Sequence, residues 1–168
     1  MDFTDAMMAF LTNASDPAVY ALLLMVYTLL NVIFLPVPVE AALFIGNMSP
    51  LLKALLVGTG KAIGSIIVLK IGASIGDVMN SRMMQWGIAK SIVNFCNWMV
   101  ARFHYLGLYI ILSIPFMVDT VPVYIFSIFN EQGFMETGPF AVVNFLAGIN
   151  RVLIVLLIFA LFGIKIGA

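Results

Sequence analysis

The chain has 168 residues, of which 63% are hydrophobic and only 10% are charged, and its basic and acidic side chains balance to no net charge. Soluble domains are far less apolar, and a chain without a basic excess lacks the electrostatic footprint of nucleic-acid binding. The single cysteine, Cys96, excludes an internal disulfide and a cysteine metal cluster. Because the sequence lacks the alternating pattern of a membrane β-barrel, we expect an all-α, multi-pass integral protein of the cell membrane, with one membrane domain over residues 1–168.

The N-terminal region predicts two helices and then a segment that enters the membrane and returns. The first dozen residues have the pattern of a short amphipathic helix at the membrane interface. We expect the first span over Pro17–Leu35. The interval from Pro36 to Asn47, which contains Pro38 and Glu40, is too short to cross a bilayer, so it predicts a re-entrant half-helix.

Residues Leu51–Gly76 form the second predicted span. Gly60 and Gly64 are four residues apart, and a second pair with the same spacing begins at Gly72. Small residues at this spacing let another helix approach closely, either within one chain or across a homodimer. Lys61 lies well inside this span, where a charge needs a partner or a water-filled cavity.

Residues 77–103 are the most polar part of the chain and predict amphipathic interfacial helices, which include Arg102. Apolar residues return at Tyr105–Phe129 and Thr137–Gly163, and these stretches predict the remaining spans. Basic residues gather in 77–103, whereas acidic residues flank the turn Glu131–Glu136. The positive-inside rule therefore places the N-terminus outside the cytoplasm.

A short pattern occurs twice and indicates an internal repeat. PVPVE at residues 36–40 and PFMVD at residues 115–119 share a proline, a valine three residues later and an acid four residues later. A second proline follows in each, at Pro38 and Pro122, and the patterns are 79 residues apart. Paired, proline-broken apolar segments are typical of transporters with inverted repeats. We therefore predict a polytopic helical bundle with two inverted re-entrant helix hairpins.

The halves of this repeat cover about residues 17–76 and 104–165. In each half the prolines free backbone groups that lipid cannot satisfy, and the acid, Glu40 or Asp119, is costly at that depth. Both features point to one wet or ligand-filled crevice between the hairpins, in which the two acids bind a proton or a sodium ion. The alternative is a chance match in which each acid lies at a loop end in the interface.

The segment Pro36-Val37-Pro38-Val39-Glu40 resembles the P-x-P-x-E motif of the DedA family, also called VTT or SNARE-associated membrane proteins. The glycine-rich span Gly60–Gly76 resembles the span that follows this motif, and the order of elements fits from about Ala21 to Gly163. The acid that often precedes the first proline of the motif is replaced here by Asn31. The family's second motif, R-F-x-P-x-x-R, keeps only its proline.

The resemblance implies two facing re-entrant hairpins in a protein that translocates phospholipids or polyprenyl phosphates, often with ion coupling. It implies Glu40 as the membrane-embedded carboxylate and Pro36, Pro38 and Pro115 as the hairpin breakers. Leu112 and Val118 stand where the second motif has arginines, so the cation for a phosphate headgroup must come from another position. The candidate cations are Lys61, Arg102 and Arg151, and the alternative for each is a structural pair with one of the acids.

Three functions follow as hypotheses. The first is a lipid flippase whose partners are a membrane lipid and a proton or sodium ion. The second is an exporter of small molecules or ions, because the early proline–acid motif and the later Ser113-Ile114-Pro115 segment resemble the small multidrug export family. The third is a membrane assembly protein without transport. The motifs of hydrolases and metalloenzymes are missing and His104 is the single histidine, so we expect neither catalysis nor a cofactor or metal site.

Overall fold

The computed structural model describes residues 3–14, 16–34, 39–45, 48–83, 98, 102–130 and 135–162. Within these ranges the ordered elements are all helices, as the composition predicts, and none is a strand. Helix α1 covers Phe3–Asn13 and α2 covers Pro17–Ile33. The Asp16 side chain accepts a hydrogen bond from the Ala18 backbone N–H at 2.8 Å, which caps the start of α2.

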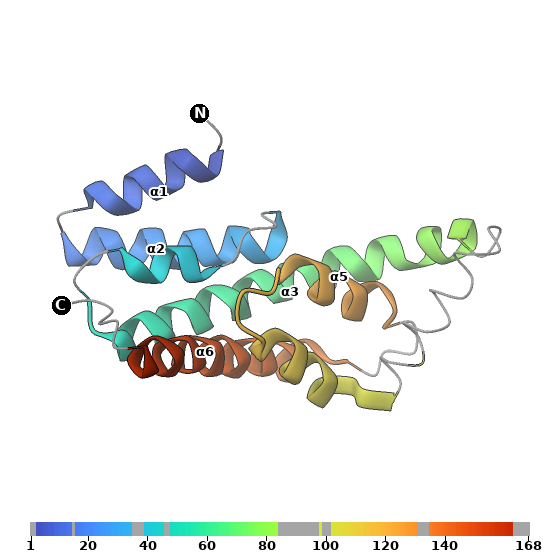
Figure 1. Ribbon diagram of the computed structural model, residues 1–168. Helices are drawn as coiled ribbons and strands as arrows, with labels where there is room; N and C mark the ends of the chain where they lie inside the picture. The colour runs from blue at the N-terminus through green and yellow to red at the C-terminus, as the bar shows by residue number, and fades with distance from the viewer. Residues whose placement is uncertain are drawn as a thin grey trace.

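The chain reverses direction after α2. A short 3-10 helix, η1 (Val39–Phe44), runs back along α2 before α3 (Pro50–Met83) begins (Figure 1). Tyr20, in the first turn of α2, donates its hydroxyl proton toward the carbonyl oxygens of Ala42 at 3.1 Å and Ile45 at 2.6 Å. The end of η1 therefore lies beside the beginning of α2.

Helix α3 is the central element, and glycines bring its neighbours close. A Cβ atom added at Gly60 would lie 2.6 Å from the Met25 carbonyl oxygen of α2, and one added at Gly72 would lie 2.0 Å from Ser127 Oγ. On another side α3 packs antiparallel to α6 (Thr137–Leu161), where Gly58 and Gly148 face each other. The close packing predicted around Gly60, Gly64 and Gly72 is confirmed.

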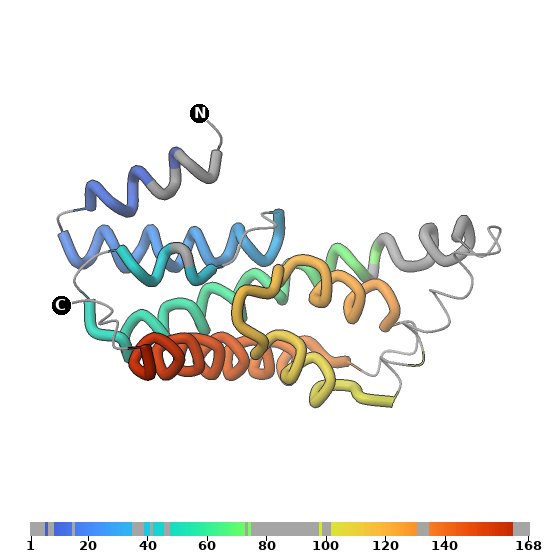
Figure 2. Tube along the Cα trace, viewed as in Figure 1, coloured from blue at the N-terminus to red at the C-terminus, as the bar shows by residue number. Residues whose placement is uncertain are grey.

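A second reversal follows in the C-terminal part. Residues 102–113 are helical, residues 114–119 break the helix, and α5 (Thr120–Ile128) then runs back (Figures 1 and 2). Phe116, in this break, has a φ of 59°, in the left-handed region that a side chain rarely adopts. Figure 1 shows that 102–113, α5 and α6 run opposite to α2, η1 and α3, respectively.

The two reversals lie against each other. The Thr120 hydroxyl donates to the Asn31 carbonyl oxygen at 2.8 Å, and the Tyr124 hydroxyl donates to the Ile33 carbonyl oxygen at 3.3 Å. Since Asn31 and Ile33 are in the last turn of α2, the first turns of α5 pack beside the point where the chain first turns back.

Two of the described helices are long and apolar enough to cross a membrane, namely the Pro50–Gly72 part of α3 and the whole of α6. Helix α2, with 17 residues, is shorter. Helix α3 itself continues past the predicted end of the span at Gly76, as far as Met83. Of the predicted interfacial helices, residues 84–97 and 99–101 lie outside the described residues.

Candidate functional site

Four charged side chains meet where the two reversals approach each other. Glu40 comes from η1, Lys61 from α3, Asp119 from the residue before α5, and Arg151 from the middle of α6. Each is at most 1% exposed. We call these four residues the charged cluster. Its two carboxylates balance its two cations.

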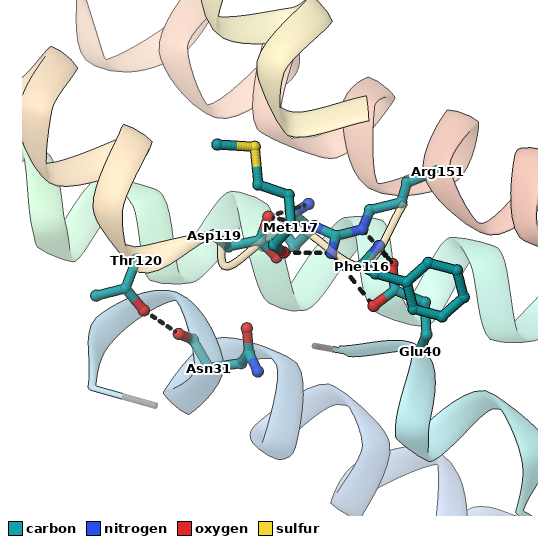
Figure 3. A network of polar contacts seen from close by, with 8 residues as sticks. Asn31, Glu40, Phe116, Met117, Asp119, Thr120 and Arg151 are labelled. Atoms are coloured by element: carbon teal, nitrogen blue, oxygen red, sulfur yellow. Dashed lines mark hydrogen bonds and ion pairs between the residues drawn. The ribbon is translucent and has the colours of Figure 1, made fainter. Parts of the chain in front are cut away.

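Arg151 is the centre of the charged cluster (Figure 3). Its Nη1 donates to Asp119 Oδ1 at 2.6 Å, while its Nε and Nη2 donate to Glu40 Oε1 and Oε2, the latter at 3.2 Å. Nη2 also donates to the Met117 carbonyl oxygen in the break before α5. A planar guanidinium with several fixed donors suits such a bridge, and a lysine ammonium could not make it.

Glu40 is held by the second break as well as by Arg151. The Phe116 backbone N–H donates to Glu40 Oε1 at 2.9 Å. Phe116 is also the residue with the left-handed backbone conformation, and in this conformation its N–H reaches the Glu40 carboxylate. Both oxygens of Glu40 therefore accept hydrogen bonds. Through the bond from Phe116, Glu40, which follows the first reversal, is joined directly to the second reversal.

Asp119 is bonded less evenly. Its Oδ1 accepts from Arg151 Nη1 and also from Lys61 Nζ at 3.0 Å. Its Oδ2 is buried and accepts no hydrogen bond within the part of the chain that the structure describes. The Lys61 stem reaches the cluster across Gly148, where an added Cβ would lie 2.9 Å from Lys61 Cδ.

The energetics of this arrangement depend on pairing. Removing a charge from water costs several kcal/mol per ion, and only a close partner with good geometry offsets that cost. Each member of the charged cluster has such a partner within 3.2 Å. Deleting a single member would leave its partner charged, buried and unbalanced.

The structure brings together four of the five predicted binding residues. Arg102 is exposed at the beginning of helix 102–113 and lies outside the charged cluster. Pro36 and Pro38 lie outside the described residues. Pro115 lies in the break after helix 102–113, as a helix breaker should.

Pro122 does not interrupt a helix. It is the third residue of α5 and is buried. A proline is tolerated in the first turn of a helix because its missing N–H would have no partner there. Pro122 is therefore part of the start of α5, and the break at residues 114–119 lies before it.

Sequence reasoning missed three buried polar side chains on α2 and α6. Tyr27 and Asn31 of α2 and Asn144 of α6 are fully buried. Their spacing could have indicated them. Tyr27 and Asn31 are four residues apart and so lie on one face of α2, and Asn144 is seven residues before Arg151 and so lies on the same face of α6. Tyr27 lies within electrostatic reach of Glu40, and Asn31 lies beside the cluster in Figure 3.

Lys53 was also missed. It is 2% exposed, and its Nζ donates to the carbonyl oxygens of Leu43 and Ile45, each at 2.9 Å. The last carbonyls of a helix have no partner within it, and a cation is favourable at that end. Lys53 and Tyr20 thus hold the end of η1, the element that carries Glu40.

Comparisons of the chain with models of protein families, with curated proteins and with solved structures find no match.

Proposed function

We propose that this protein is a membrane transporter of the DedA type that moves a phospholipid or a polyprenyl phosphate across the bilayer. Transport is coupled to a proton or cation through Glu40 and Asp119. The observation that supports this function best is the bridge of Arg151 between these two acids, one from each reversal of the chain.

A multi-pass location in the cell membrane is part of the proposal. Helix α6 exposes large apolar side chains at four-residue spacings, at Val142 and Leu146 and again at Leu153 and Leu157. In water such a stripe would be costly, whereas lipid would cover it. In the proposed architecture, α2 with η1 and helix 102–113 with α5 are the two inverted re-entrant hairpins.

The charged cluster supports transport because stability alone does not explain it. Apolar side chains of similar volume would fill the same space at lower cost than four desolvated charges. Ionisable residues inside membrane segments mark substrate and ion pathways. The broken backbone at residues 114–119 also belongs beside a cavity or within protein, because lipid cannot satisfy its polar groups.

A membrane assembly protein without transport is the second candidate. The pairing of every carboxylate in the charged cluster with an internal cation favours it. Export of cationic compounds has less support, since it calls for an acidic crevice and both Lys61 and Arg151 lie beside the acids.

The test is lipid movement in proteoliposomes. The purified protein is reconstituted with a fluorescent phosphatidylglycerol or a radiolabelled polyprenyl phosphate, and exposure to the outer leaflet is measured with and without a proton gradient. We expect transport that the gradient accelerates and that a Glu40→Gln, Asp119→Asn double variant loses. Unchanged transport in the folded double variant would refute the role of the acids. A folded wild-type protein that moves neither lipid would favour the assembly function.

A further inference from the structure

We infer that the charged cluster takes up one proton and one phosphate-type anion together, the proton on Asp119 Oδ2 and the anion at Lys61. This inference rests on the proposed function and names the coupling ion, its site and the headgroup partner. It follows from an asymmetry between the two acids that their sequence equivalence does not predict.

Protonation would affect the hydrogen bonds of the two carboxylates differently. Glu40 accepts hydrogen bonds on both oxygens, from two Arg151 nitrogens and the Phe116 N–H. A proton on Glu40 would therefore lie on an oxygen that already accepts at least one of these hydrogen bonds, and it would weaken that bond. In Asp119, by contrast, Oδ1 accepts both hydrogen bonds, from Lys61 and from Arg151. The buried Oδ2 accepts none from the described residues. Protonation of Oδ2 forms an O–H bond and breaks no hydrogen bond.

A metal cation fits this position less well than a proton. Lys61 Nζ and Arg151 Nη1 lie 3.0 Å and 2.6 Å from the other oxygen of the same carboxylate. Two positive charges at this range repel a third in a medium of low dielectric constant. A proton avoids this repulsion because it converts the carboxylate to a neutral acid.

The other charged and titratable groups around Asp119 determine where the excess positive charge lies once Asp119 is protonated. Lys61 faces it from α3 and Arg151 faces it from α6, while Glu40 of η1 lies across Arg151, and Tyr27 of α2 lies within electrostatic reach of Glu40. Arg151 keeps its two-pronged contact with Glu40 when Asp119 is neutral. The excess positive charge then belongs to Lys61.

A buried ammonium without a counter-ion is costly, so the protonated cluster favours entry of an anion. A lysine ammonium is a common point-charge partner of phosphate groups. The anion binds without covalent change, and the proton on Asp119 keeps the total charge balanced. Release of the anion restores the positive excess, so the proton leaves with it. The coupling is therefore co-transport of one proton with one negative charge.

Proton uptake on anion binding tests this coupling in the wild-type protein. The protein in nanodiscs of zwitterionic lipid, lightly buffered with a pH-indicator dye, receives inorganic phosphate in one arm and dihexanoyl phosphatidic acid in the other. We expect about one proton taken up per anion bound, and an affinity that falls about tenfold per pH unit above the protonation midpoint. Binding of phosphate alone assigns the site to the phosphate group, whereas binding of the lipid alone shows that the acyl chains are needed.

Three variants separate the roles. Asp119→Asn mimics the protonated acid, so it should bind the anion without proton uptake and without pH dependence. Lys61→Met should lose anion binding, whereas the control Lys70→Met, exposed on the same helix, should bind normally. Infrared titration of the wild type should show the carbonyl band of a protonated carboxyl. Asp119→Asn should lose this band, and Glu40→Gln should keep it.

Two results that do not depend on transport would overturn the inference. One is anion binding by the wild type with no proton uptake, and the other is an infrared band that Glu40→Gln removes and Asp119→Asn does not. Both readouts are independent of transport. Gradient-driven movement of a zwitterionic phospholipid without binding of either anion would refute the inference and leave the proposed function standing.

Discussion

Glu40 and Asp119 are 79 residues apart in the sequence, and one guanidinium group, that of Arg151, binds both of their carboxylates. Each acid follows a reversal of the chain, and the arginine comes from α6, the long helix that runs antiparallel alongside α3. The bridge therefore fixes the relative position of both halves as well as neutralising the acids. A change in either half that moved Arg151 away from one acid would therefore also alter its contact with the other acid.

Arg151→Met should be strongly destabilising. It removes both carboxylates' shared partner, and a buried ion pair that loses one member costs about 3–5 kcal/mol. Urea or heat unfolding of the protein in detergent, followed by circular dichroism, measures the loss. The control is Arg102→Met, an exposed arginine outside the charged cluster, which we expect to change the free energy of unfolding by less than about 0.5 kcal/mol. Equal losses for the two variants would contradict the central role of Arg151.

The meeting of the two acids could be predicted from the sequence, because the proline–acid pattern repeats and both copies interrupt apolar runs. The choice of Arg151 and Lys61 as their partners could not. Sequence distance does not say which base reaches an acid, and Arg102, closer to Asp119 in the chain, lies exposed outside the cluster. What decides the outcome is that α6 crosses α3 at Gly58 and Gly148, which places Lys61 and Arg151 together.

Some helix boundaries could likewise be predicted from the sequence and others could not. The start and end of α6 lie close to the predicted Thr137–Gly163 because turn residues flank one long apolar run. Helix α3 extends past the predicted Gly76 to Met83, since hydropathy reports where apolar residues end and polar residues can continue a helix. The short η1 has too few residues for a periodic signal.

Lys53→Met should loosen η1 while leaving the long helices folded. The change removes the donor to the Leu43 and Ile45 carbonyl oxygens, and each buried acceptor left unpaired costs about 1–3 kcal/mol. Hydrogen exchange measured by mass spectrometry should show faster exchange in peptides that contain residues 39–45. Lys70→Met, exposed on the same helix, is the control and should leave this exchange unchanged. If both variants exchange at the wild-type rate, Lys53 does not hold η1.

Gly148→Ala should separate α3 from α6 at the level of the charged cluster. An added Cβ would lie 2.9 Å from Lys61 Cδ and 3.0 Å from Gly58 Cα, and the backbone contact cannot yield without moving a helix. Such overpacking costs about 1–3 kcal/mol, which unfolding in detergent would measure. Gly138→Ala in the first turn of α6 is the matched control, because nothing lies within 4 Å of its added Cβ and the same substitution should be neutral or slightly stabilising there. If Gly148→Ala proved as well tolerated as Gly138→Ala, the close crossing of α3 and α6 would not be what holds Lys61 beside Asp119.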